Sequence, residues 1–263
     1  MRNKTLELVS ILKGQCDFLV VGGALPSINP ELFLNNFDIV VIGEGEQTML
    51  ELVKQLENGG DLCQIKGIAY KDKDTGQVKR TSPRALVDDL DRFPPPSRDL
   101  FDNYSYKKHY SGRFGYKTTA IMTSRGCPFT CDFCSRPVFG NEFRSRSASK
   151  VADEIEEVIS LGYNRIWFAD DCFTLNRQRL IEVCDEIIKR GLKIGWECLS
   201  RVDTLDSETA DKMKQAGCVR MFFGIESGNY SILKIMNKQI TTKQAYTATK
   251  ICKRKVSKQE HSL

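Results

Sequence analysis

The sequence predicts an α/β protein whose larger part is a parallel β-sheet built from four strand–helix units. Three successive helical patterns end at a glycine, and a new apolar strand begins within a few residues of each. Strands that alternate with helices in this way give a parallel sheet with right-handed crossovers. A smaller α/β region precedes this part, because two β-branched runs, at 17–23 and 37–43, each close on glycine, as strands covered on both faces do.

The smaller region is expected to extend over residues 1–82. Between its two strands, residues 30–35 can form a short helix, and residues 46–58 follow as a longer amphipathic one. The stretch 65–80 has the pattern of a β-hairpin that turns at Asp-Thr-Gly. Residues 83–116 are rich in proline, tyrosine and charge, which predicts a linker with little regular structure.

The larger region is expected to extend over residues 117–263. Four apolar stretches predict its strands, at 118–123, 165–169, 193–199 and 219–225. Helical periodicity predicts the intervening helices at 149–161, 177–190 and 207–216, with further helical patterns at 230–236 and 242–254. The glycines that end the three intervening helices are Gly162, Gly191 and Gly217.

Composition and charge exclude several classes of protein. The net charge of +5 comes from 39 basic and 34 acidic residues that are interspersed, which disfavours a nucleic-acid partner. No apolar run approaches the ~20 residues of a membrane span, and the first ten residues lack a signal-peptide pattern. We therefore expect a cytoplasmic chain without a transmembrane segment, in which ten cysteines need a reason other than disulfides.

Three of these cysteines lie in the segment TSRGCPFTCDFCSRP, at positions 127, 131 and 134. The spacing would also suit one stripe of a helix, but Gly126, Pro128 and Pro137 argue for an irregular loop. Structural zinc usually has four ligands, and His109 and His261 have no ligand-like spacing to this loop. Three thiolates that leave a coordination position open suit an iron–sulfur cluster that binds a substrate. The other seven cysteines are expected to be buried apolar side chains.

The short sequence motifs around this loop resemble those of a known protein family. SRGCPFTCDFCS, FADDCF, WECLSRVD, FGIESG and MNK resemble the radical S-adenosylmethionine (SAM) superfamily, in the subgroup with an N-terminal cobalamin-binding domain. That subgroup includes the anaerobic magnesium-protoporphyrin ester cyclase and radical methyltransferases. The likeness covers residues 17–248 and implies a partial (β/α) barrel of four units preceded by a partial doubly wound domain.

The resemblance also implies the chemistry. A [4Fe-4S] cluster would be held by Cys127, Cys131 and Cys134, and its remaining iron would bind SAM. One electron, from a donor such as a flavodoxin or ferredoxin, would cleave SAM to a 5′-deoxyadenosyl radical that abstracts hydrogen. Methyl transfer or rearrangement would follow on a substrate that the sequence does not identify, a small molecule or a lipid-like compound.

Other positions match the family's cofactor contacts. Phe133 would pack near the adenine, or belong to the core. Asp170 and Asp171 would lie near the methionine ammonium, or form a solvated turn or helix cap. Glu226 and Ser227 match the ribose-contacting position, or act as a cap. Arg201 could pair with the methionine carboxylate or with Glu197. No residue is assigned as a catalytic acid or base.

Residues 20–53 resemble the second half of a cobalamin-binding domain. Glycines that would let the backbone approach a ligand there are Gly22, Gly23, Gly43 and Gly45. The first strands of that domain and an Asp-x-His-x-x-Gly segment are missing, so weak or no cobalamin binding is expected. Four βα units instead of the family's six also predict a chain shortened at both ends.

Three functions remain open on the sequence. The first is a radical SAM enzyme. The second is a truncated, non-catalytic protein that binds a cluster or a cofactor. The third is a zinc-stabilised nucleic-acid-binding module, which the thiol count and the dispersed charge disfavour.

Overall fold

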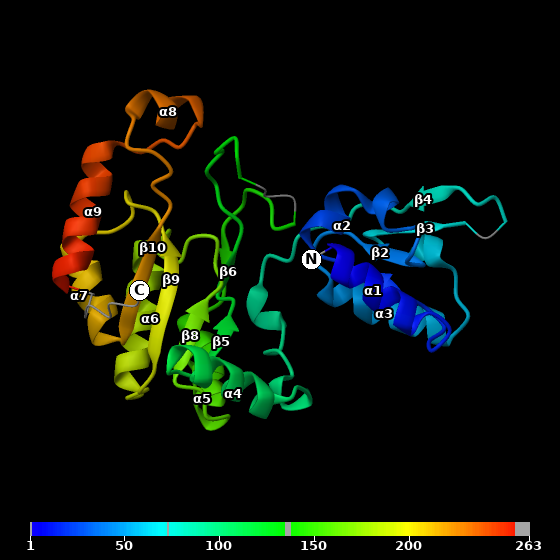
Figure 1. The fold of residues 1–263 in the computed structure, drawn as a ribbon, viewed down its shortest axis with the longest axis horizontal. Helices are drawn as coiled ribbons and strands as arrows, with labels where there is room; N and C mark the ends of the chain where they lie inside the picture. Colours follow the sequence, from blue (N-terminus) through cyan, green and yellow to red (C-terminus); the bar gives the residue numbers. More distant parts are fainter. Residues whose placement is uncertain (1, 73, 135–137, 256–263) are drawn as a thin grey trace. The chain divides into compact units, whose positions relative to one another are not determined.

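The computed structural model describes residues 2–72, 74–134 and 138–255 (Figure 1). The chain separates into two compact units, one of Met1–Val87 with Ser135–Gly140 and one of Asp88–Cys134 with Asn141–Leu263. In the described part of the chain no helix combines the length and the apolar character that crossing a bilayer requires. The two units are described separately below.

The first unit is built on a four-stranded sheet in the order β1-β2-β3-β4. The predicted parallel pair is present as β1 (Val20–Val21) and β2 (Ile39–Val41), shorter than expected. The predicted hairpin is confirmed as β3 (Ile68–Lys71) and β4 (Val78–Arg80). Because β3 runs antiparallel to β2, the sheet is mixed.

Helices pack on this sheet, and their packing explains why strand β2 is apolar. They are α1 (Arg2–Leu12), α2 (Ala24–Ile28) and α3 (Glu46–Glu57), with 3-10 turns at Pro30–Leu32 and Leu62–Gln64. Ile39 packs in a cluster with Leu52 of α3, whereas its neighbour Val40 packs in a second cluster with Phe33. β2 is therefore buried on both faces, which its β-branched sequence predicted.

The second unit contains a four-stranded parallel sheet in the order β10-β9-β8-β5. Its strands are β5 (Thr118–Ile121), β8 (Arg165–Phe168), β9 (Gly195–Ser200) and β10 (Cys218–Phe223). Each strand pairs with the one that precedes it in this series, as in a barrel opened after four units. The predicted parallel sheet of four βα units is thus confirmed.

The crossover helices α5 (Ala148–Ser160), α6 (Arg177–Lys189) and α7 (Ser207–Gln215) pack on one face of that sheet (Figure 1). Two shorter segments, α8 (Tyr230–Ile235) and α9 (Thr242–Lys255), follow β10. Ile166 and Phe168 of β8 point into the helix-covered core. Trp167, between them, contacts Phe222 of β10 on the other face, at 5.4 Å between ring centroids.

The glycines predicted to end the crossover helices adopt left-handed backbone conformations in the structure. Gly162, Gly191 and Gly217 have φ angles of +82°, +64° and +95°. At Gly217 a Cβ atom would also lie 2.3 Å from the backbone oxygen of Ile194, so a side chain has neither the conformation nor the space. The chain can therefore turn from α7 directly into β10.

The proline-rich stretch contains a helix that the sequence interpretation did not include. α4 (Asn103–Phe114) begins where the Asp102 carboxylate accepts a hydrogen bond from the Ser105 amide, and ends at Gly115 with φ +76°. Both are ordinary helix-capping signals. The stretch before it forms only 3-10 turns, at Leu90–Arg92 and Arg98–Leu100.

A buried carboxylate joins this stretch to the sheet. Glu154 of α5 accepts hydrogen bonds from Arg98, at 2.5 Å, and from Arg146, and its side chain is 1% exposed. Arg98 also donates to the backbone oxygen of Ala120 in β5, at 2.8 Å. Glu154 is therefore a buried counter-charge that two guanidinium groups share.

We expect Glu154→Ala to lower the free energy of unfolding by about 3 kcal/mol or more, because it removes the buried counter-charge that Arg98 and Arg146 share. Urea unfolding followed by circular dichroism measures this. The matched control is Glu157→Ala on the same helix, whose carboxylate is 37% exposed and lies 3.9 Å from Arg98. That change should cost no more than about 1 kcal/mol. Equal losses would contradict the assigned role of Glu154.

Candidate functional site

The cysteine loop, residues 126–134, starts just beyond the carboxyl end of β5. Before it, β6 (Ser124–Arg125) pairs antiparallel with β7 (Arg144–Ser145). The chain that leaves the pair after Arg125 therefore returns to it at Arg144. The loop is irregular, as predicted, and Gly126 begins it with φ +81°. The carboxyl ends of parallel strands are where barrel enzymes place their active sites.

The three thiols of the loop differ in exposure. Cys131 is 6% exposed, Cys127 is half-buried and Cys134 is exposed. The amide of Cys134 donates to the backbone oxygen of Cys131 at 3.1 Å, so these two residues share a turn. None of the ten cysteines, all of which lie in described segments, forms a disulfide.

The donor set of three thiols in one loop has the chemistry of an iron–sulfur cluster. Among the described residues, no three His, Cys, Asp or Glu side chains gather closely enough for one metal ion. A four-iron cluster binds each thiolate through a different iron, so its ligands need not converge on one point. His109 is exposed on α4, and His261 lies outside the described residues.

Asp170 fastens the start of the loop to the sheet. Its Oδ1 accepts from the amides of Thr123 and Ser124, at 2.6 and 3.1 Å, and its Oδ2 from their hydroxyls, at 2.5 and 2.7 Å. Arg179 of α6 lies 3.9 Å from the carboxylate and donates to the Thr123 backbone oxygen at 3.0 Å. Asp170 is 1% exposed, so its carboxylate is already fully used inside the protein.

Its neighbour Asp171 is the carboxylate of the pair that solvent reaches. Crowding by neighbouring atoms partly desolvates it and raises the pKa of Asp171, and the charge of Asp170 adds to the shift. A hydrogen bond from the Gly126 amide acts in the opposite direction. Asp171 is therefore an accessible acidic group beside the first residue of the cysteine loop, and it can accept a cation.

Glu226 and Phe133 lie around one buried lysine that the sequence interpretation did not single out. Lys238 is 7% exposed, and its Nζ lies 3.1 Å from Oε1 of Glu226 and 5.4 Å from the Phe133 ring centroid. Phe133 is 49% exposed, so it is not a core residue. A Cβ at Gly224 would lie under 3 Å from both charged groups, so a side chain there would displace the ends of Glu226 and Lys238. In the sequence, Lys238 was marked only as the last residue of the motif MNK.

Arg201 does not pair with Glu197. Its guanidinium makes two hydrogen bonds to Asp203, at 2.9 and 2.8 Å, because the two residues are close in the turn after β9. It also lies 3.4 Å from the ring centroid of Phe129 in the cysteine loop. Glu197 instead faces Arg220 of β10, at 3.4 Å. The structure thus places Arg201 against the cysteine loop through a ring contact.

Ser227 lies in the turn before α8. Its hydroxyl oxygen accepts from the amide of Asn229, the residue that caps α8, at 3.1 Å. Its neighbour Glu226 has a left-handed backbone, with φ +67°. The turn therefore places Glu226 and Ser227 just beyond the carboxyl end of β10.

The four glycines of the first unit follow β1 and β2. Gly23 and Gly43 have φ angles of +107° and +81°, so backbone conformation alone favours glycine at both. The Gly43 amide donates to Oγ of Ser27 at 3.0 Å. A cavity of about 750 Å³ in this unit is lined by none of the four glycines. Their role toward cobalamin therefore rests on the resemblance.

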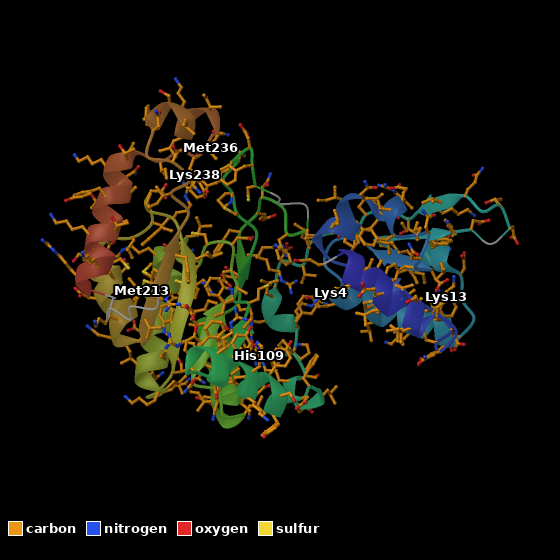
Figure 2. All side chains as sticks on the ribbon, viewed as in Figure 1. Lys4, Lys13, His109, Met213, Met236 and Lys238 are labelled. Carbon is orange, nitrogen blue, oxygen red and sulfur yellow. The ribbon has the colours of Figure 1, made fainter. Side chains whose placement is uncertain are left out.

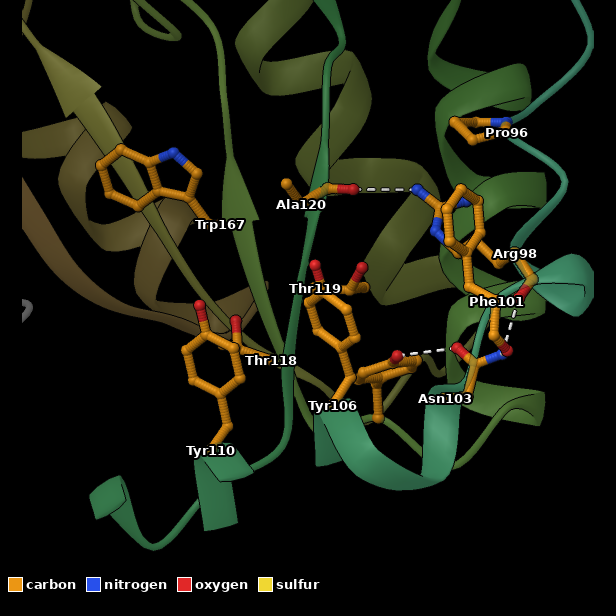
Figure 3. Close-up of a pocket in the computed structure, with 11 residues that line it drawn as sticks. Pro96, Arg98, Phe101, Asn103, Tyr106, Tyr110, Thr118, Thr119, Ala120 and Trp167 are labelled. Carbon is orange, nitrogen blue, oxygen red and sulfur yellow. Dashed lines mark hydrogen bonds between the residues drawn. The ribbon is translucent and has the colours of Figure 1, made fainter. Parts of the chain in front are cut away.

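A cavity of about 420 Å³ lies in the second unit, beside the edge strand β5 (Figure 3). Aromatic residues of α4 and β8 contribute much of its wall. The full lining is Pro96, Arg98, Phe101, Asn103, Tyr106, Tyr110, Thr118, Thr119, Ala120, Tyr163 and Trp167. None of the predicted site residues is among them. It is therefore separate from the cysteine loop and its surroundings.

Sequence comparison finds relatives over most of the chain. Residues 121–261 match the family model described as the radical SAM superfamily. An uncharacterized methyltransferase of Pyrococcus horikoshii is 40% identical over 90% of this chain and 51% of its own length. The anaerobic magnesium-protoporphyrin IX monomethyl ester cyclase of Rubrivivax gelatinosus is 34% identical over 82% of this chain and 39% of its own. The chain thus spans about half the length of these relatives, or less.

Solved structures give the same picture of the fold. The cobalamin-dependent SAM radical enzyme OxsB, with aqua-cobalamin and SAM bound, matches with a TM-score of 0.74 and 26% identity, over 94% of this chain and 36% of its own. The radical SAM methyltransferase TsrM of Kitasatospora setae matches with a TM-score of 0.80 over 97% of this chain and 51% of its own. At 20% identity, the second likeness concerns the fold alone.

We expect Asp170→Asn to lower the free energy of unfolding by about 3 kcal/mol, because it removes the counter-charge of the buried Arg179 and turns an acceptor into a donor. Urea unfolding at pH 7 measures the loss. Asp171→Asn is the control, since it neutralises the adjacent carboxylate without touching these bonds. Similar losses in both variants would contradict the anchoring role of Asp170.

Asp171→Asn should stabilise the protein at neutral pH. An acid whose pKa is raised by folding binds its proton more tightly in the folded state, so its contribution to stability falls as pH rises above the ordinary value of 3.8. The variant should therefore be more stable than the native protein at pH 7, and the difference should vanish below pH 3.8. Thermal unfolding across this pH range measures it. A gain that does not depend on pH would argue against the raised pKa.

Proposed function

Because this chain belongs to the radical SAM superfamily, we propose that it is an iron–sulfur enzyme that cleaves S-adenosylmethionine reductively. The observation that carries the proposal is the Cys-x3-Cys-x2-Cys loop at the carboxyl end of the first strand of a parallel βα sheet, inside the matched region. Family membership implies a [4Fe-4S] cluster and SAM as cofactors. The three thiols of one irregular loop have the donor chemistry of such a cluster.

The cofactors would supply the hard chemistry: when bound, the reduced cluster gives one electron to SAM, which then yields a 5′-deoxyadenosyl radical able to abstract hydrogen. The chain's own residues bind and orient. Cys127, Cys131 and Cys134 would hold the cluster through their thiolates. Asp171 accepts the methionine ammonium, for which it is the solvent-accessible carboxylate of the pair.

The remaining predicted contacts divide into direct and supporting roles. Phe133, half-exposed beside Lys238, offers a ring face to the adenine, and Glu226 and Ser227 accept from the ribose hydroxyls. Asp170 and Arg201 hold the cysteine loop in place and do not contact a cofactor directly. Their polar atoms are already hydrogen-bonded to protein groups. This division revises the direct contacts that the resemblance alone assigned to them.

The reaction beyond SAM cleavage is proposed from the relatives. A methyltransferase and a cyclase among them favour methyl transfer or rearrangement, with a small or lipid-like substrate that stays unspecified. OxsB is a cobalamin-dependent relative above 25% identity, which makes cobalamin a candidate cofactor. A flavodoxin or ferredoxin as electron donor, and a cytoplasmic location, complete the proposal.

A non-catalytic cluster-binding protein is the second candidate. Three thiols in one loop are enough to hold a cluster, whereas cleavage of SAM also needs contacts to the SAM molecule. Release of 5′-deoxyadenosine from SAM by anaerobically reconstituted protein under dithionite would decide for the enzyme. A bound cluster without that release would decide for the binding protein.

We expect Cys131→Ala to lose the cluster iron and all 5′-deoxyadenosine release, because one of three thiolate ligands is gone. Iron, sulfide and zinc analysis after anaerobic reconstitution, followed by chromatography of the nucleoside, measures both. Cys172→Ala is the matched control: Cys172 is 3% exposed, close to the 6% of Cys131, and burial raises the pKa of its thiol. Zinc in place of iron, or full iron in Cys131→Ala, would overturn the proposed function.

A further inference from the structure

We propose that Asn237 is a positioning residue that holds the cysteine loop in its ligand-binding shape. The inference rests on the proposed function of the three cysteines. Asn237 is the middle residue of a clasp, Met236–Lys238, which directly follows α8. Met236 and Lys238 lie close together at the end of that helix (Figure 2). The clasp contacts the cysteine loop from a position 107 residues further along the chain.

The clasp binds the loop on both sides of Cys131. Nδ2 of Asn237 donates to the backbone oxygen and to Oγ1 of Thr130, each at 2.9 Å. The amide of Asp132 donates to the backbone oxygen of Met236 at 3.1 Å. Thr130 precedes Cys131 and Asp132 follows it, so the clasp fixes the backbone around the one buried thiol of the loop.

A hydrogen bond from Gln239 orients the Asn237 side chain toward Thr130. Nε2 of Gln239 donates to Oδ1 of Asn237 at 3.3 Å, which leaves the amide nitrogen to face Thr130. Asn237 and Gln239 both have left-handed backbones, with φ +50° and +56°. At Asn237 this is the ordinary left-handed end of a helix, because the amides of Asn237 and Lys238 donate to the backbone oxygens of Lys234 and Leu233. The end of α8 therefore fixes the backbone that carries the Asn237 side chain.

The clasp is also tied to the strand ends that carry the candidate SAM contacts. Arg201, after β9, donates to the backbone oxygen of Lys238 at 3.2 Å. Lys238 pairs with Glu226, after β10, at 3.1 Å. The clasp thereby joins the cysteine loop to two neighbouring strand ends. The three thiols then keep a fixed position relative to Glu226. A cluster that binds SAM beside Glu226 would require this fixed position.

The first test uses the protein without a cluster. In Asn237→Ala and Asn237→Gly, the alkylation rate of Cys131 by iodoacetamide should rise about tenfold, because the loop loses two hydrogen bonds and opens more often. Peptide mass spectrometry follows each cysteine separately. Cys184, buried in α6, reports global unfolding and should not change. The glycine variant relieves the left-handed backbone, so a role in backbone conformation alone would leave its Cys131 rate unchanged.

The matched control is Asn229→Ala. Asn229 caps the same helix, and its Oδ1 accepts from the amides of Ser231 and Ile232. This change weakens α8 by a lost cap, while the hydrogen bonds to the cysteine loop remain. Its Cys131 rate should stay within about twofold of the native rate. Unchanged Cys131 in both Asn237 variants, or Cys131 and Cys184 rising together, would overturn the proposal.

The second test uses the reconstituted protein. Asn237→Gly should lose iron to a chelator several-fold faster than the native protein, and the electron paramagnetic resonance spectrum of its reduced cluster should shift. Asn229→Ala should retain the native spectrum and rate. Native protein that binds no iron would end the proposed function, while the alkylation result would still decide whether Asn237 holds the loop. A native spectrum and iron-loss rate in Asn237→Gly would end the inference alone.

Discussion

One buried carboxylate fixes where the cysteine loop begins. β5 and β8 are neighbours in a parallel sheet, so the segments that leave their carboxyl ends emerge side by side. Asp170 uses this proximity: both its oxygens accept from Thr123 and Ser124, two and three residues after β5 ends. Asp170 therefore attaches the start of the cysteine loop to the sheet. The positions of the three thiols depend on that attachment.

A second attachment acts further along the same loop. The clasp bonds Thr130 and Asp132, while the thiol between them stays outside these bonds. The backbone oxygen of Thr130 and the amide of Asp132 are thus satisfied by protein partners. Attachment of the backbone on both sides of Cys131 is the kind of outer support that orients a metal ligand.

The fold was largely predictable from the sequence, and the site only in part. Glycines after α5, α6 and α7 marked the helix ends because the left-handed turn requires them. α4 was missed because prolines and polar residues dominated the interpretation, although Asp102 and Gly115 are capping signals. The cysteine spacing predicted the cluster ligands, which stay a prediction. The commitment of Asp170 to Thr123, and of Asn237 to Thr130, depends on partners 47 and 107 positions away, which no local pattern reveals.

The long reach of the clasp has a consequence for biosynthesis. Thr130 leaves the ribosome 107 residues before Asn237, so during elongation the cysteine loop exists without its second attachment. At the usual speed of about 5–20 residues per second, that interval lasts roughly 5–20 seconds. The nascent thiols are then accessible to oxidants and to competing metals. With the clasp in its proposed role, productive loading of the cluster would follow completion of the helix that ends at Ile235.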